Sequence, residues 1–333
     1  MQRGFAMSEK IVLTRRAQLV ALAVQMAGYV PAESLAVLAL RAGRVGPIAV
    51  VELPPDPADL TSAVTVQTLT GALRRHADAA VLLVFTDRPD TWEPPLQRLA
   101  EYLGHTAEIG AVLHADARSY SSYDSDAAEH GTWSLDDLPD GVRLTGLRVW
   151  ASRDALRAVL DPDRGGRVID RQQFTDAAAE LTGGAEVAQR GTALLDQAFT
   201  LAQRGRPLDD DQAADLIVAL AGDALARFTA VVDAVAAAAD PARRAAALSA
   251  LTMLVGATPD ELIEGTGTVL AYAAYVGGDG ALANLAIDRI ARTGRSVPTV
   301  EVLDALIRQA TPPAQIKAFI DTTAQRLFDR PTP

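Results

Sequence analysis

The sequence predicts an α/β domain with a small mixed sheet, followed by an all-α domain. Two observations support this fold class. Short apolar runs alternate with helix-like segments as far as about residue 150, which is the pattern of α/β proteins. After Ser152 the strand-like runs stop, and apolar residues recur only at helical spacing. We therefore expect a disordered start, an α/β domain, a connecting segment and a helical domain over residues 1–9, 10–150, 151–170 and 171–330.

The α/β domain is expected to open with a helix and a β-hairpin. Thr14 can cap a helix that ends near Met26. Ser34–Leu40 is a near-continuous apolar run, which is typical of a strand buried on both faces. A glycine-containing turn follows, and Ile48–Leu53 is then predicted to pair back on the first strand.

The alternation of strands and helices continues beyond the hairpin. A helix, a strand, a helix and two strands are expected over residues 60–76, Ala79–Thr86, Trp92–Leu103, Ala107–His114 and Arg118–Tyr123. Pro94 and Pro95 are expected in the first turn of their helix, where the missing N–H groups have no intrahelical partner. The last two strands are expected to pair through a short turn, so the sheet is mixed.

The second half contains apolar stripes at helical spacing, separated by prolines. It is expected to be a helical bundle or a stack of helical hairpins, because no repeat of fixed period is present to predict a solenoid. Three stripes stand out, at Leu225, Phe228, Val231, Val232 and Val235, at Val302, Leu303, Leu306, Ile307 and Ala310, and at Ile316, Phe319, Ile320 and Leu327.

Composition excludes several classes of function. The chain has no cysteine, which rules out thiol nucleophiles, disulfides, iron–sulfur clusters and cysteine-ligated zinc. Its net charge of −11 disfavours nonspecific nucleic-acid binding, which requires clustered basic residues. No apolar run approaches the roughly 18 residues of a transmembrane helix. We expect a cytoplasmic protein that binds neither nucleic acid nor membrane, and no cofactor is predicted.

One segment near the start resembles a targeting signal. Arg15 and Arg16 precede an apolar run, as in a twin-arginine signal. We interpret the segment as an amphipathic core helix, because Gln18 and Gln25 are seven residues apart and share one face. It also runs directly into Gly28 and a strand, without a small-residue cleavage site.

Several motifs occur in an order that resembles DUF4192, a family of actinobacterial proteins without an established function. The most specific is the segment Ala271–Ile290, which contains Gly278-Asp-Gly-Ala-Leu-Ala-Asn284. The others are Gly28-Tyr-Val-Pro-Ala-Glu-Ser-Leu35, Val51-Glu-Leu-Pro54, Arg118-Ser-Tyr-Ser121 and Ser152-Arg153. The resemblance implies no substrate, cofactor or active site. Family members often have a cysteine in the loop after the Arg-x-x-Ser strand, whereas this chain has none over Asp124–Gly131.

The glycine-rich segment Gly277-Gly-Asp-Gly280 is predicted to be a structural turn between two helices. Glycine-rich turns before helices can also bind phosphate. Here the turn follows a helix, lacks lysine, and contains Asp279, which would repel phosphate. We therefore expect Gly277 or Gly278 to end one helix in the left-handed conformation and Asp279 to cap the next. Asn284 is expected to form a hydrogen bond across this hairpin.

A candidate ligand site lies at the carboxyl ends of two strands. If the strands that end at Thr86 and His114 are parallel neighbours, their ends share the sheet edge where α/β proteins bind ligands. This edge would gather Asp87, Arg88, His114 and Asp116, with Arg118 and Tyr120 on the next strand. A histidine beside carboxylates can act as a general base, and Arg118 with Tyr120 can hold a planar anion. The alternative is that these are ordinary turn residues and a solvated sheet face.

Two functions follow from these observations. The first is a non-catalytic binding, assembly or scaffold protein, in which residues 225–235 and 302–328 contribute buried or intersubunit stripes to a homo-oligomer or a complex with a protein partner. The second is a ligand sensor or enzyme that uses the strand-end edge. No catalytic triad and no H-E-x-x-H motif accompanies that edge, so we predict no catalytic and no metal-binding residue.

Overall fold

The computed structural model describes residues 13, 15–123, 129–139, 149–161, 167–181, 184–309 and 311–328. Its contacts divide the chain into two units. The sheet unit comprises residues 1–26 and 31–144, and the helical unit comprises residues 27–30 and 145–333. The start predicted to be disordered, residues 1–9, lies outside the described residues.

The sheet unit is built on a mixed sheet, as predicted. Within the described residues the sheet has six strands in the order β2-β1-β3-β4-β5-β6. Only β3 and β4 pair in parallel, and the other neighbours are antiparallel. The strands are β1 (Ser34–Arg41), β2 (Arg44–Glu52), β3 (Ala79–Phe85), β4 (Glu108–Ala115), β5 (Ser119–Ser122) and β6 (His130–Thr132).

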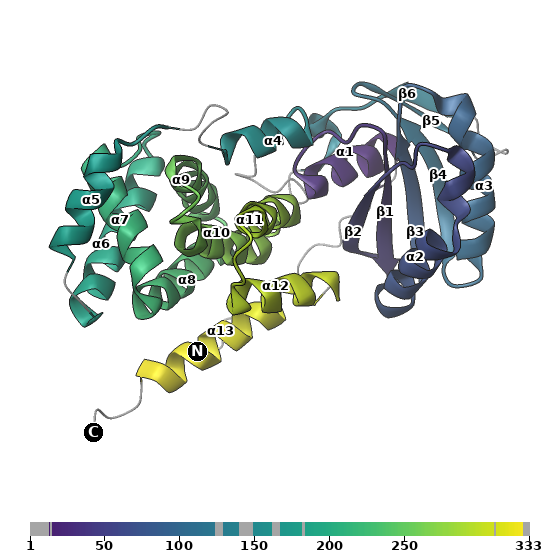
Figure 1. Cartoon of the computed structure of the whole chain (residues 1–333). Helices are drawn as coiled ribbons and strands as arrows, with labels where there is room; N and C mark the ends of the chain where they lie inside the picture. Colours follow the sequence, from purple (N-terminus) through teal and green to yellow (C-terminus); the bar gives the residue numbers. More distant parts are fainter. Residues whose placement is uncertain are drawn as a thin grey trace, which may run out of the picture. The chain divides into compact units, whose positions relative to one another are not determined.

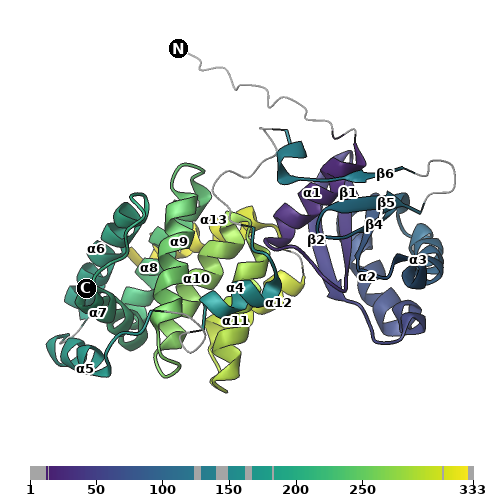
Figure 2. The same cartoon turned by 90° about the horizontal axis from the view of Figure 1, so that it is seen from above.

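Helices cover both faces of this sheet (Figures 1 and 2). On one face, side chains of α2, α3 and the short helix η1 form a core with alternate residues of β1 and β3. Figures 1 and 2 show α1 on the opposite face. Burial on both faces explains the continuous apolar run of β1, whose first six residues are all buried. The helical elements of this unit are α1 (Arg16–Ala27), η1 (Pro57–Thr61), α2 (Ala63–His76), α3 (Pro89–Gly104) and η2 (Leu135–Asp137).

The helix α3 begins earlier than the sequence predicted. Pro89 occupies its first turn, where proline is well suited to start a helix. As a result, Pro94 and Pro95 lie inside the helix, and the prediction that they belong to the first turn is wrong. The expected helix over residues 60–76 is also divided, because Ser62 ends η1 and caps α2 through its side chain.

The helical unit contains the remaining helices of the described chain. Most of them contact α10, whose residues are buried along nearly its whole length. The helices are α4 (Arg153–Val159), α5 (Arg171–Glu180), α6 (Gly184–Ala202), α7 (Asp210–Gly222), α8 (Ala224–Ala239), α9 (Arg244–Ala257), α10 (Ile263–Gly277), α11 (Gly280–Arg292), α12 (Pro298–Arg308) and α13 (Pro313–Phe328). The C-terminal region is helical, as predicted, and α4 lies within residues 151–170, which were predicted to be a connecting segment. None of the described helices is both long and apolar enough to cross a membrane.

Two glycines allow neighbouring helices to approach α10 closely. A Cβ atom at Gly265 would lie 2.4 Å from the backbone carbonyl of Leu220 at the end of α7. A Cβ atom at Gly267 would lie 2.8 Å from the end of the Ile290 side chain on α11. The first neighbour is rigid backbone and the second is a flexible side chain. The absence of a side chain is therefore required most strictly at Gly265.

Candidate functional site

The predicted strand-end edge exists, because β3 and β4 are parallel and Val84 pairs with His114. Both strands therefore end at the same edge of the sheet. The antiparallel strand β1 starts there, since Ser34 pairs with Phe85. This brings Glu33 to the edge, although nothing in the sequence singled it out beyond its place in the Gly28–Leu35 motif.

Glu33 is the centre of a polar cluster at this edge. Its carboxylate accepts hydrogen bonds from the Thr86 hydroxyl at 2.6 Å and from the Arg88 guanidinium at 2.9 Å. Burial alone would raise the pKa of Glu33, but these hydrogen bonds and the charge of Arg88 bring it below its ordinary value. Glu33 also has a φ of 43°, which is uncommon for a residue with a side chain. Asp87 points to solvent, with its side chain 89% exposed.

His114 is held by hydrogen bonds at both ring nitrogens. Its Nε2 lies 2.8 Å from the carbonyl oxygen of Thr86, and its Nδ1 lies 3.3 Å from the Ser121 hydroxyl. A carbonyl oxygen can only accept, so Nε2 carries a proton and donates it to Thr86. With 8% of its surface exposed, His114 is engaged in the protein interior and has no nitrogen left for a substrate.

Asp116 stabilises the turn between β4 and β5. Its carboxylate accepts hydrogen bonds from the backbone N–H groups of Arg118 and Ser119, at 2.7 and 2.6 Å, and from the Ser119 hydroxyl at 2.6 Å. Burial would raise the pKa of Asp116, but these bonds lower it. The Trp133 indole donates to the Asp116 carbonyl oxygen. This is the bonding of an Asx turn, which fully accounts for the aspartate.

Arg118 and Tyr120 are not placed to bind one ligand together, because one side chain is exposed and the other is buried. Arg118 precedes β5 and is exposed. Tyr120 is buried, with its ring against Gly131 of β6, where a Cβ atom would lie 3.1 Å from the ring. Its hydroxyl donates to Glu129 at 2.8 Å, and burial together with this carboxylate raises the pKa of Tyr120. The six candidates thus lie near one edge, but His114, Asp116 and Tyr120 already bond within the protein.

The predicted glycine turn joins α10 to α11. Gly278, and not Gly277, adopts the left-handed conformation, with a φ of 90°. The Asp279 carboxylate accepts from the Leu282 N–H at 2.9 Å and caps α11, which begins at Gly280. Asp279 is only 5% exposed, and this burial raises its pKa to about 6. Gly278 and Asp279 therefore have structural roles in this turn.

The family motif at Gly28 packs on this turn. A Cβ atom at Gly28 would lie 3.1 Å from the Asp279 carboxylate, and Gly28 has a φ of 75°. Two motifs that are far apart in the sequence are therefore in contact in the folded chain. Asn284 does not contribute as expected, because it is exposed and forms no hydrogen bond with the described residues.

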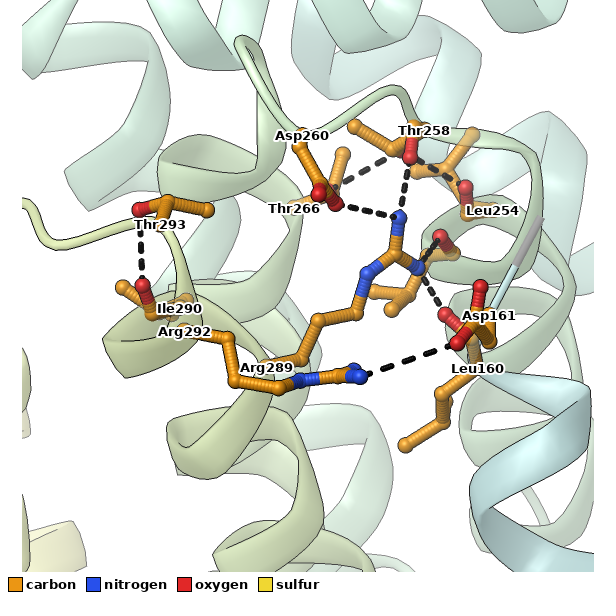
Figure 3. A network of polar contacts seen from close by, with 11 residues as sticks. Leu160, Asp161, Leu254, Thr258, Asp260, Thr266, Arg289, Ile290, Arg292 and Thr293 are labelled. Carbon is orange, nitrogen blue, oxygen red and sulfur yellow. Dashed lines mark hydrogen bonds and ion pairs between the residues drawn. The ribbon is translucent and has the colours of Figure 1, made fainter. Parts of the chain in front are cut away.

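Arg289 is a buried charge that no motif of the sequence indicates. It is 1% exposed, and its guanidinium donates to the backbone carbonyls of Leu160, Val255 and Thr258. Figure 3 shows the Arg289 guanidinium beside Leu160 and Thr258. Its Nη2 atom lies 3.7 Å from the Asp260 carboxylate. The carbonyls belong to the carboxyl ends of α4 and α9, where helices lack intrahelical donors. Arg289 therefore stabilises the ends of two helices from a third.

Several apolar side chains of α8 and α13 are exposed to solvent. We call this set of residues the α13 surface and define it by Leu225, Phe228, Phe319, Leu327 and Phe328. Phe319 is 63% exposed, and Leu327 and Phe328 are each about half exposed. The rings of Phe228 and Phe328 lie 6.4 Å apart, which joins the two helices. These residues fall in the predicted stripes at 225–235 and 302–328.

No group of three or more histidine, aspartate or glutamate residues that could hold a metal ion occurs in the described part of the chain.

Residues 17–314 match the family model of DUF4192, which is described as a domain of unknown function. Neither the curated proteins nor the solved structures contain a match to the chain.

Proposed function

The chain belongs to the DUF4192 family, and we propose that it is a non-catalytic cytoplasmic assembly protein whose α13 surface binds a second copy of the chain. The observation that carries this proposal is the exposure of the apolar face of α13 in its last turn. The strand-end edge gives less support to a sensor or an enzyme, because the bonds of His114, Asp116 and Tyr120 are already made within the sheet unit.

The apolar face of α13 is covered at its start and open at its end. Ile316, Ile320 and Ala324 are buried against the helical unit. Leu327 lies seven residues after Ile320 and three after Ala324, so it continues the same face. It is nevertheless 51% exposed, and Phe319 beside this face is 63% exposed. Apolar residues that extend a buried face into solvent are typical of an interface.

The charge of α13 favours a second copy as the partner. The chain carries a net charge of −11, so two copies repel each other over most of their surfaces. The helix α13 has two basic residues, Lys317 and Arg326, and one acidic residue, Asp321. Its charge of +1 makes it a place where two copies can approach with little repulsion. An apolar patch bordered by both signs of charge can face itself across a two-fold axis.

The test compares the mass in solution of the wild type with that of a double variant, Phe319→Asp with Leu327→Asp. Sedimentation velocity across a dilution series should show a concentration-dependent dimer for the wild type and a monomer for the variant. The matched control is Val64→Asp, because Val64 is 74% exposed in the sheet unit and does not belong to the α13 surface. It should dimerise like the wild type.

A wild type that remains monomeric at every concentration would overturn the proposal. So would a double variant that dimerises normally. Because both substituted side chains are exposed, thermal unfolding of the variant should match that of the control at dilutions where the control is also monomeric, which separates loss of assembly from loss of folding.

A further inference from the structure

A groove with a volume of about 550 Å³ lies between α4 and α11 in the helical unit. Its volume is in the range of sites that hold small molecules. It differs from the strand-end edge because it offers basic, acidic and apolar side chains together. The lining residues are Arg157, Leu160, Leu285, Asp288, Ala291 and Arg292.

One wall of the groove is a single face of α11. Leu285, Asp288 and Arg292 are spaced at i, i+3 and i+7, which places them on the same side of the helix. The other wall is the end of α4, with Arg157 in its last turn and Leu160 at its cap. The buried guanidinium of Arg289 bonds to the Leu160 carbonyl and fixes this end of α4 beside α11 (Figure 3).

The charged groups of the groove are held by loose ion pairs. Arg292 lies 3.6 Å from Asp161, and Asp288 lies 3.6 Å from Arg153. Both distances exceed that of a good hydrogen bond. Arg157 bonds to Asp154 at 3.2 Å within its own helix, and the Asp154 side chain is 82% exposed. The Arg153–Asp288 and Arg157–Asp154 pairs are exposed and contribute little free energy, so a ligand can replace them. Asp161 is only 14% exposed and remains beside Arg292.

We propose that this groove binds a small zwitterion, namely a free α-amino acid with an apolar side chain. Its carboxylate would bond to Arg157 and Arg292, for which guanidinium groups are well suited. Its ammonium group would pair with Asp288. Its side chain would lie on Leu160, Leu285 and Ala291. Each lining residue then has one complementary group on the ligand.

Simpler ligands match the groove less well. A purely anionic ligand would meet the charge of Asp288, and a purely apolar ligand would form no bond with the two arginines of the lining. Asp288 and Arg292 are one helical turn apart, with Cβ atoms separated by roughly 6 Å. This spacing suits a molecule in which one carbon atom carries both the ammonium and the carboxylate group.

The test is a calorimetric titration of the full chain with three probes: L-leucine, N-acetyl-L-leucine and L-leucinamide. Leucine should bind with a dissociation constant of about 1 mM or lower. The acetylated probe lacks the ammonium group and leucinamide lacks the carboxylate, so each should bind at least about tenfold more weakly, since one lost charged contact corresponds to roughly that factor.

Two variants test which residue contacts the ammonium group of the ligand and which contacts its carboxylate. Asp288→Asn should remove the preference for leucine over N-acetyl-leucine, and Arg157→Gln should remove the preference for leucine over leucinamide. Arg308→Gln is the control, since Arg308 is exposed on α12 and pairs with Asp304 in the same helix. The control should titrate like the wild type, and all three variants should unfold at similar temperatures.

Absence of leucine binding would overturn the inference, as would equal binding of the three probes or unchanged preferences in the two variants. The site shares no residue with the α13 surface. Sedimentation of the groove variants should therefore show normal assembly, which keeps this test independent of the proposed function.

Discussion

At the scale of residues, Arg289 shows how a buried charge can be structural. A guanidinium has five N–H donors in a planar fork, so one side chain can bond to several carbonyls. Arg289 uses this geometry to join the ends of α4 and α9 to α11. The negative ends of the two helix dipoles also favour a cation at this position. The arginine thus holds three helices together, and its burial does not indicate catalysis.

We predict that Arg289→Met destabilises the protein by about 3–5 kcal/mol, because it leaves buried carbonyls without donors. Arg289→Lys should also destabilise, because one ammonium group cannot reach both helix ends. The control is Arg308→Met, at a side chain that is 78% exposed, and it should change stability by no more than about 0.5 kcal/mol. Urea unfolding measures all three. Equal losses for Arg289→Met and the control would contradict the role of Arg289 in joining the helix ends.

Asp279 should make the stability of the helical unit depend on pH. Its pKa is raised from 3.8 to about 6 by burial, so the folded state holds the proton more tightly than the unfolded state. The stabilisation is therefore complete below pH 3.8 and is lost as the pH rises through 6. The gap between the two pKa values corresponds to at most about 3 kcal/mol.

The substitution Asp279→Asn removes this titration and keeps a capping oxygen. Its stability relative to the wild type should therefore increase between about pH 4 and pH 7, as measured by urea unfolding at several pH values. Asp279→Ala loses the cap as well and should be about 1 kcal/mol less stable than Asp279→Asn. A difference between Asp279→Asn and wild type that does not vary with pH would show that the carboxyl group is not buried as described.

The roles of residues that contact their neighbours in the sequence were predictable. The roles of residues that contact distant parts of the sequence were not. The cap at Asp279 and the left-handed glycine next to it follow from neighbouring residues, and both were predicted. Arg289 binds carbonyls that lie 34 and 129 residues away, so no local pattern reveals it. Glu33 joins Thr86 only because β1 and β3 are neighbours in the sheet.

At the scale of elements, small residues determine how the helices pack. The stripe predicted on α8 used its large residues, but Leu225 is exposed and Phe228 is only half buried. The buried face of α8 consists mainly of alanines, at positions 226, 230, 234, 237 and 238. Alanine is common throughout this chain, so its periodicity is a weak signal. Large apolar residues outside the packed face are then available for an interface.

The glycines of α10 provide a matched pair of substitutions. Gly265→Ala places a methyl group against the backbone of Leu220, which cannot move without displacing α7. Gly267→Ala meets only the end of Ile290, which can change its rotamer. We predict that Gly265→Ala costs about 1–3 kcal/mol or more, and that Gly267→Ala costs less, because alanine also favours the helix by about 1 kcal/mol. Thermal unfolding shows which of the two variants is less stable. A larger loss of stability for Gly267→Ala would be inconsistent with this packing.

At the scale of the whole molecule, the architecture was predictable and the function was not. The alternation of apolar runs predicted the mixed sheet, and the loss of strand-like runs after Ser152 predicted the helical half. The sheet edge was also predicted correctly, because parallel neighbours must end together. Whether side chains at that edge remain free for a ligand depends on contacts between strands. His114 and Tyr120 bond within the sheet, which no spacing in the sequence reveals.

Native mass spectrometry of the full chain tests whether two copies assemble through the α13 surface. We expect a species at twice the mass of the 35.1 kDa chain, which disappears in the Phe319→Asp, Leu327→Asp variant and persists in Val64→Asp. If the wild type is found only at the mass of a single chain, at every concentration at which it can be measured, the chain does not assemble in this way.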